Sequence, residues 1–385
     1  MSGAGPGPGE GAPGPGRGPG GVPRAIALSP ILSARYRAED LARIAAAAPG
    51  ARIVTVSAEG LADGPLDEVE VLLRGSLAAE VFDRILARAP HLVWVHSATA
   101  GVERVLTPAS RARGLVITNA RGVFSQPIAE YVVAVILAVT RRLPELLELQ
   151  RERTWQPLVG TELADRTVAI VGYGSIGRHL AALLAPFGCR ILAVRRRPEL
   201  GLGGTEGGEE GQAEEAAPAG AAGVDRAGPV GARGGPTGGP RIAPRVDALV
   251  GPDALADVLR EADFVVLALP LTAATANLVD EARLALMKRG AWLVNVARAQ
   301  LVDEVALRRA LREGRLGGAV LDTFLDEPLP PTSPWWTTPN VIVTPHTSWS
   351  SGRVLDRSIE LFCENLRRYA SGQPLRNVVD PAAGY

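Results

Sequence analysis

The feature that most constrains the fold of this chain is a glycine-rich turn between an apolar strand and an apolar helix. The sequence Gly-Tyr-Gly-Ser-Ile-Gly at 172–177 follows the strand-like run Val168–Val171 and opens the helical stretch Ile176–Phe187. This G-x-G-x-x-G pattern, in that context, is typical of dinucleotide-binding βαβ units, where backbone N–H groups at the helix N-terminus hold a pyrophosphate. The residues that we predict to bind the cofactor here are Gly172, Gly174, Ser175, Ile176 and Gly177.

Strand-like and helix-like segments alternate along most of the chain. The expected strands before the glycine-rich turn are Ala25–Leu28, Arg52–Val56, Val69–Leu73, Leu92–His96 and Val116–Asn119. Those from the turn onward are Thr167–Val171, Arg190–Val194, Phe264–Ala268, Trp292–Val296, Gly318–Asp322 and Val341–Thr344. Such alternation predicts parallel sheets that are covered by helices on both faces. The fold class that we predict is α/β, with two Rossmann-like, doubly wound domains, one of them a flavodoxin-like substrate domain.

The order of these segments also suggests where the domains begin and end. We expect residues 24–125 and 346–380 to form the substrate-binding domain, because a closing helix over Arg353–Ser371 would return to it. Residues 126–345 would form the dinucleotide-binding domain. Two segments lie outside this pattern: residues 1–22 and the insertion 199–243 are dominated by small residues, glycine and proline among them. Their low apolar content predicts disorder.

Composition excludes several classes of function. Lys plus Arg and Asp plus Glu both number 41, so the net charge of zero gives no basic footprint for nucleic acid or an anionic membrane. The longest apolar run is too short to span a bilayer, and no signal peptide is visible. Two isolated cysteines, Cys189 and Cys363, offer neither a disulfide framework nor a metal site. We therefore expect a cytoplasmic protein without a metal.

The choice of cofactor should depend on the end of the strand Arg190–Val194. An NAD site needs a carboxylate there to hold the ribose 2′-OH, but the sequence continues as Arg195-Arg196-Arg197-Pro198. Arg195 and Arg196, at a strand tip near the surface, can pair with a 2′-phosphate. This pattern favours NADP(H) and leaves NAD(H) possible; a solvated basic turn is the alternative interpretation.

Three blocks near the C-terminus identify a family. Asn295-Val296-Ala297-Arg298-Ala299 ends one expected strand, Leu321 to Pro330 (LDTFLDEPLP) follows the next, and Val343 to Ser348 (VTPHTS) follows the last. Together they resemble the signature blocks of the D-isomer-specific 2-hydroxyacid dehydrogenases, and the stretch 328–344 is most similar to the glyoxylate/hydroxypyruvate reductases. The resemblance implies that Arg298, Glu327 and His346 are the catalytic residues.

Further expectations come from the same resemblance. Ala100 and Gly101, in the sequence Thr-Ala-Gly-Val-Glu, match the loop whose backbone amides hold the substrate carboxylate, with Arg298 and His346 also contacting the substrate. Glu103 stands where an Asp is common. Pro270, Val296 and Asp322 would contact the cofactor, although helix capping is an alternative for Asp322. The family also implies a homodimer with its contact over Pro127–Arg153.

The implied chemistry suits these residue types. Arginine can bind a carboxylate and a carbonyl oxygen with a fixed fork of donors, and histidine can donate a proton near neutral pH. A glutamate beside the histidine would favour and orient the imidazolium. We therefore expect hydride transfer from NAD(P)H to a small 2-oxo acid, which gives a D-2-hydroxy acid. The alternatives are a dinucleotide-sensing corepressor-like binding protein and a dehydrogenase for another small 2-hydroxy acid.

Overall fold

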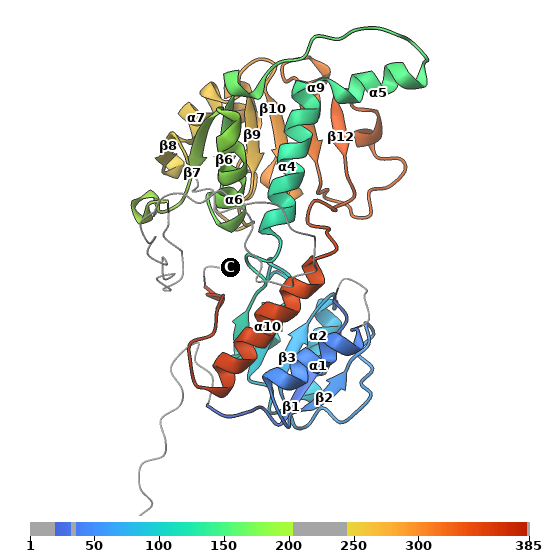
Figure 1. Cartoon of the computed structure of the whole chain (residues 1–385), viewed down its shortest axis with the longest axis vertical. Coiled ribbons are helices and arrows are strands. Elements are labelled where there is room, and N and C mark those ends of the chain that lie inside the picture. The colour runs from blue at the N-terminus through green and yellow to red at the C-terminus, as the bar shows by residue number, and fades with distance from the viewer. Residues whose placement is uncertain (1–19, 32–35, 203–244, 383–385) are drawn as a thin grey trace, which may run out of the picture.

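Two parallel sheets organise the computed structural model, which describes residues 20–31, 36–202 and 245–382. The first sheet has five strands in the order β2-β1-β3-β4-β5 and lies in the lower part of Figure 1. Its strands are β1 (Ala25–Leu28), β2 (Arg52–Thr55), β3 (Val69–Arg74), β4 (Trp94–Ser97) and β5 (Val116–Thr118). The helices of this part are α1 (Ala38–Ala47), α2 (Ala79–Arg88), α3 (Pro108–Ala112) and α10 (Val354–Ala370).

The second sheet has seven strands in the order β12-β11-β10-β9-β6-β7-β8, and every pairing in it is parallel. Its strands are β6 (Thr167–Val171), β7 (Arg190–Val194), β8 (Ala248–Val250), β9 (Phe264–Leu267), β10 (Trp292–Asn295), β11 (Gly318–Leu321) and β12 (Val341–Val343). Its helices are α4 (Ser125–Thr140), α5 (Leu143–Arg151), α6 (Ser175–Leu184), α7 (Leu255–Glu261), α8 (Glu281–Leu286) and α9 (Glu304–Arg312). The α/β fold class with two doubly wound sheets is thus confirmed.

Both faces of each sheet are covered, which explains the nearly continuous apolar runs of the strands. All five residues of β6 are buried, and successive side chains enter opposite cores: Ala169 and Val171 pack on one face, Val168 and Ile170 on the other. The same division occurs in β1, where Ala25 and Ala27 face one core and Ile26 and Leu28 the other.

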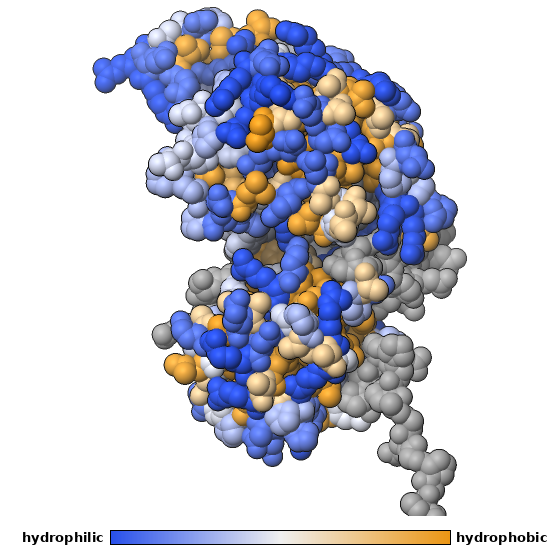
Figure 2. Space-filling view, turned by 180° about the vertical axis from the view of Figure 1, so that it is seen from behind, coloured by the Kyte–Doolittle hydropathy of each residue, from blue (hydrophilic) through white to orange (hydrophobic). Residues whose placement is uncertain are grey.

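The C-terminal helix α10 joins the end of the chain to the first sheet. It packs against α1, and the Tyr369 ring stacks on Trp94 of β4 with 5.5 Å between the ring centroids. Figure 1 shows α10 beside α1 in the lower part, and the space-filling view narrows between the two parts (Figure 2). We therefore propose the domain boundaries predicted from the sequence, with residues 346–380 assigned to the substrate-binding part.

The structure differs from the sequence-based expectation in a few segments. The sequence predicts one long helix over residues 127–153, but the structure has two, α4 and α5, which are separated at Arg142, whose φ of 55° lies in the left-handed region. The edge strand β8 and the helices α7 and α8 were not predicted. Glu199 and Leu200 belong to a 3-10 helix, Pro198–Leu200, so the insertion begins later than expected. The disorder predicted for residues 1–19 and 203–243 lies outside the described residues. No helix in the described ranges is long and apolar enough to cross a membrane.

Candidate active site

Three neighbouring strands carry the predicted catalytic residues to one edge of the second sheet. Arg298 follows β10, Glu327 follows β11 and His346 follows β12, and these strands are adjacent in the order β12-β11-β10. Parallel strands end at the same edge of a sheet and lie about 4.8 Å apart. The topology therefore gathers three segments that are well separated in the sequence.

His346 and Glu327 form a direct pair. The His346 Nδ1 lies 2.8 Å from Glu327 Oε2, while Glu327 Oε1 accepts a hydrogen bond of 2.9 Å from the Phe324 backbone N–H. Both carboxylate oxygens are therefore engaged, which fixes the orientation of the acid and of the ring. Because Nδ1 faces the carboxylate, the imidazole presents Nε2 on its other side. Both side chains are about two-fifths exposed, so the pair is open to solvent.

The backbone of His346 has a φ of 50°, a conformation that costs free energy for a residue with a Cβ. Asp322 holds the segment in this shape. Its side chain is fully buried, and it accepts hydrogen bonds from Thr344 Oγ1 (2.6 Å), from the Thr347 N–H (2.8 Å) and from the Ser348 N–H (3.0 Å). A carboxylate has about four acceptor positions, so one stays available for a further donor.

Tyr131 of α4 extends this network, although sequence reasoning did not select it. Its hydroxyl lies 2.8 Å from Thr344 Oγ1, which itself donates to Asp322. Burial raises the pKa of Tyr131 to about 12, so the phenol stays protonated and can donate. The position of Thr344 at a strand end was a usable signal, whereas nothing near Tyr131 in the sequence indicates this contact.

Arg298 meets the first domain. A Cβ built on Gly101 would lie 2.2 Å from Arg298 Nη2, so the guanidinium packs directly on the Gly101 backbone. Arg298 Nε donates to Glu103 Oε1 at 3.3 Å, and Nη1 donates to the Ala297 carbonyl at 2.8 Å. The structure thus brings the predicted substrate loop, which includes Ala100, to the predicted arginine. Sequence reasoning noted Glu103 but did not assign it to the site.

The glycine-rich turn leaves room where a ligand would approach. A Cβ on Gly172, whose φ is 106°, would lie 2.5 Å from the Ala268 carbonyl oxygen, and one on Gly177 would lie 2.5 Å from the Gly172 oxygen. Both positions are thus packed against the backbone. Gly174 is exposed, and a Cβ there would meet nothing within 4 Å. The turn, which continues into α6 through Ser175 and Ile176, is therefore open at the position where phosphates would bind.

Positive charge surrounds this turn, as a dinucleotide requires. Arg178, on α6, was not selected from the sequence; burial and the nearby charge of Arg195 lower its pKa. Tyr173 is buried within the turn, and its hydroxyl is close enough for Arg178 and Arg195 to influence its pKa. Backbone space at Gly174 and two neighbouring guanidinium groups fit a dinucleotide pyrophosphate or phosphate.

The surroundings of Arg195 differ from the expectation. Arg195 directly follows β7, as predicted, but the prediction that it lies near the surface is wrong, because the residue is only 5% exposed. Its backbone N–H donates to the Val250 carbonyl of the edge strand β8, and Nη1 donates to the Gly201 carbonyl at 2.8 Å. These contacts fold the side chain inward. Arg196 is exposed, as predicted.

The remaining predicted cofactor contacts lie on the same edge of the sheet. Pro270 follows β9 and is exposed, and its carbonyl accepts a hydrogen bond of 2.8 Å from Thr275 Oγ1. Val296 follows β10 and is 6% exposed. Among the described residues, no group of three His, Cys, Asp or Glu side chains is arranged to hold a metal ion.

Comparison with known proteins identifies the family. The model of the D-isomer specific 2-hydroxyacid dehydrogenase NAD binding domain matches residues 133–208 and 241–348. A glyoxylate reductase of Thermofilum pendens is 31% identical over 315 residues, which are 80% of this chain and 79% of that protein. The chain belongs to the D-isomer-specific 2-hydroxyacid dehydrogenases. Members of this family are NAD(P)-dependent oxidoreductases that act on CH–OH donors and interconvert 2-hydroxy and 2-oxo acids, as does this dehydrogenase.

Two further similarities concern substrate and cofactor. A D-3-phosphoglycerate dehydrogenase of Mycobacterium leprae is 32% identical to this dehydrogenase, over 82% of this chain and 52% of that protein. The crystal structure of an NADPH-dependent glyoxylate/hydroxypyruvate reductase from Sinorhizobium meliloti, in complex with NADP and sulfate, matches with a TM-score of 0.71 and 25% identity. The match covers 94% of this chain and all of that one.

Proposed function

We propose that this dehydrogenase reduces small 2-oxo acids of the glyoxylate and hydroxypyruvate kind to D-2-hydroxy acids, with NADPH as the preferred reductant. The observation that carries the proposal is the arrangement at the sheet edge. Glu327 and His346 form a pair and follow the adjacent strands β11 and β12, and β11 lies next to β10, which precedes Arg298. The Arg298 guanidinium packs on the Gly101 loop of the other domain. In this proposal the proton donor His346 and the carboxylate receptor Arg298 act on the same bound substrate.

In the proposed mechanism, the backbone amides of Ala100 and Gly101 hold the substrate carboxylate together with Arg298. The guanidinium also stabilises the negative charge that develops on the carbonyl oxygen. His346 then donates a proton from Nε2 to that oxygen, while Glu327 orients the ring through Nδ1 and stabilises the imidazolium. The bound nicotinamide would supply the hydride, and the protein supplies the position.

Asp322 and Val296 would border the nicotinamide end of the cofactor in this proposal. The free acceptor position of Asp322 suits the carboxamide N–H₂ group, and the three donors that Asp322 accepts fix its orientation. The same carboxylate therefore positions the His346 segment and would position the cofactor, so capping alone does not describe its role.

The preference for NADPH rests on the strand end after β7. No acid follows Val194, the exposed Arg196 can pair with a 2′-phosphate, and the neighbouring buried Arg195 adds positive charge. Because Arg195 is buried, its replacement would disturb folding, so the exposed Arg196 is the better test. We expect Arg196→Asp to weaken NADPH binding by about 10-fold or more and to leave NADH binding within a few-fold. Equal kcat/KM values of the native protein for the two cofactors at low salt would refute the preference.

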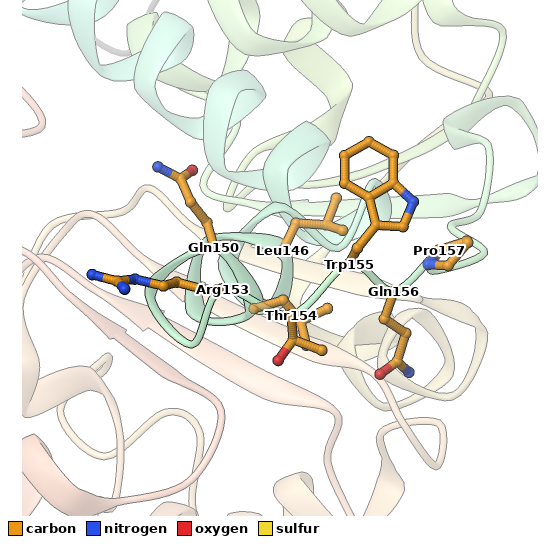
Figure 3. Close-up of a pocket in the computed structure, with 8 residues that line it drawn as sticks. Leu146, Gln150, Arg153, Thr154, Trp155, Gln156 and Pro157 are labelled. Carbon is orange, nitrogen blue, oxygen red and sulfur yellow. The ribbon is translucent and has the colours of Figure 1, made fainter.

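We further propose that the protein is a cytoplasmic homodimer that associates through α5. The helix exposes Leu143, Leu146 and Leu147 at the spacing of one helical face. The segment after it exposes Trp155 at 98%. A cavity of about 570 Å³ lies between helix and segment, and Figure 3 shows Leu146, Trp155 and the other side chains around it. Apolar groups exposed together in this way favour association. Sedimentation of the native chain and of the Leu146→Asp variant tests the proposed association. If the native chain sediments as a monomer, the dimer is refuted.

The direct test of the proposed function is NADPH oxidation with glyoxylate, with hydroxypyruvate and without an acceptor. We expect acceptor-dependent turnover with at least one of the two acids. Tight binding of NADPH without turnover of either acid would refute the proposal and favour a dinucleotide-sensing protein. Turnover of only other 2-oxo acids would retain the reaction type and change the substrate.

A further inference from the structure

A carboxylate of the chain itself lies on the arginine that would receive the substrate. Glu103 Oε1 is 3.3 Å from Arg298 Nε. A Cβ built on Gly101 would lie 2.5 Å from Glu103 Oε2 and 2.2 Å from Arg298 Nη2, so both charged groups cover the Gly101 backbone together. The Glu103 side chain thus occupies the border of the space in which a substrate carboxylate would meet Arg298.

This contact changes the charge balance of the site. The ion pair joins the Arg298 cation to an anion that belongs to the loop at 100–103 itself. Glu103 neutralises Arg298, and it does so near the surface, since the two side chains are 48% and 34% exposed. A single substrate carboxylate can share the guanidinium, which has five N–H donors. A second anionic group on the substrate would meet the negative charge of Glu103.

The loop keeps Glu103 close to this space even if its side chain rotates. Val102 and Val105 are buried on either side of it, and Thr99 Oγ1 donates to the Gly101 carbonyl at 2.8 Å. Below the loop, the buried Arg74 at the end of β3 donates from Nη2 to the Arg104 carbonyl at 3.1 Å. The backbone at 103 is therefore anchored from both sides.

Arg104, the next residue, could in principle compensate for a second anion. However, Arg104 is close enough to Arg74 for its charge to lower the pKa of Arg74. Burial of Arg74 is the larger cause of that lowering. Arg74 lies under the loop, over the Phe82 ring of α2 at 5.3 Å. The charge of Arg104 is thus felt at Arg74, whereas Glu103 contacts Arg298 directly.

We propose that Glu103 is a specificity-determining residue that favours monoanionic 2-oxo acids over acceptors with a second anionic group. This inference rests on the proposed function, in which Arg298 binds the substrate carboxylate. The family comparison does not decide between monoanionic acceptors and acceptors with a second anionic group, because the relatives include both a glyoxylate reductase and a D-3-phosphoglycerate dehydrogenase. A role of Glu103 would decide between these two classes.

The test compares the native protein with Glu103→Gln, which keeps the shape of the side chain and removes its charge. The acceptors are hydroxypyruvate, a monoanion, and oxaloacetate, which carries a second carboxylate. Two like charges about 6 Å apart in a partly solvated site repel enough to change a binding ratio about 3- to 30-fold. We therefore expect the variant to raise kcat/KM for oxaloacetate, relative to hydroxypyruvate, by about that factor.

Binding provides a readout that does not depend on turnover. Oxamate and oxalate have nearly the same shape, but oxalate carries one more negative charge. We expect Glu103→Gln to tighten oxalate binding more than oxamate binding in the presence of NADPH, and Glu103→Asp to keep the native ratio. Glu80→Gln, which neutralises an exposed acid on α2, is the matched control and should leave both ratios unchanged.

The outcomes separate the two proposals. If the native protein reduces 2-oxo acids but Glu103→Gln and Glu103→Ala leave both ratios unchanged, the role of Glu103 is refuted and the proposed function stands. If no 2-oxo acid is reduced, the proposed function fails. The oxalate and oxamate ratios then still decide whether Glu103 discriminates between anions at this site. A matching change in Glu80→Gln would indicate a general charge effect and would also refute the role of Glu103.

Discussion

Asp322→Asn is the substitution whose effect follows most directly from the structure. The change is isosteric, so it creates no cavity, but the amide nitrogen cannot accept a hydrogen bond. Asp322 Oδ1 accepts from Thr344 Oγ1 and from the Thr347 N–H, and Oδ2 accepts from the Ser348 N–H. In the best orientation of the new amide, its oxygen keeps the first two donors and its nitrogen faces the Ser348 N–H.

The magnitude can be estimated from these bonds. One buried donor loses its acceptor, which costs about 1–3 kcal/mol, and the two remaining bonds are no longer charge-assisted, which costs roughly 0.5–1 kcal/mol each. The sum is about 2–5 kcal/mol. For a domain of this size, such a loss should lower Tm by roughly 5–15 °C. Because His346 has a positive φ within the same segment, we also expect kcat to fall.

Thermal unfolding followed by circular dichroism measures the first effect, and NADPH oxidation measures the second. Asp326→Asn, which neutralises an exposed acid in the neighbouring segment, is the matched control and should leave Tm unchanged. Thr344→Val removes one of the three donors and should give an intermediate loss. If Asp322→Asn melted at the native temperature, the three hydrogen bonds would not be what stabilises the His346 segment.

Three further predictions concern the catalytic residues and the cofactor turn. His346→Gln should lower kcat with NADPH and hydroxypyruvate by about 10²–10⁴-fold and leave NADPH affinity nearly native; near-native turnover would remove His346 from the mechanism. Arg298→Lys should lower kcat/KM by roughly 100-fold or more, because one ammonium cannot replace the fork that packs on Gly101; a value within a few-fold of native would contradict that contact. Gly177→Ala should weaken NADPH binding, measured by nucleotide fluorescence, since its Cβ would lie 2.5 Å from the Gly172 oxygen. Gly352→Ala, where a Cβ meets nothing within 4 Å, should bind NADPH as the native protein does.

Much of the fold could be predicted because its signals are local. The glycine pattern at 172–177, the apolar strands and their alternation with helices depend on residues close in the sequence, and the strand ends then follow from the rule that parallel strands share an edge. The segments that were missed are short or lack a strong pattern. The edge strand β8 has only three residues, all partly exposed, and α4 is separated from α5 where Arg142 has a left-handed backbone conformation.

The candidate site, like the fold, could be predicted from the sequence only in part. The sequence alone determined the types of group at the site, Arg298, Glu327 and His346, because each follows an apolar strand in a recognisable block. Only the tertiary structure decided how they are held. Asp322 accepts from residues more than 20 positions later, and Glu103 meets Arg298 across 195 positions and two domains. Arg195 is buried because an edge strand passes beside it. Contacts of this kind depend on which surfaces the packed sheets bring together. No pattern of neighbouring residues in the sequence indicates which distant residues will meet.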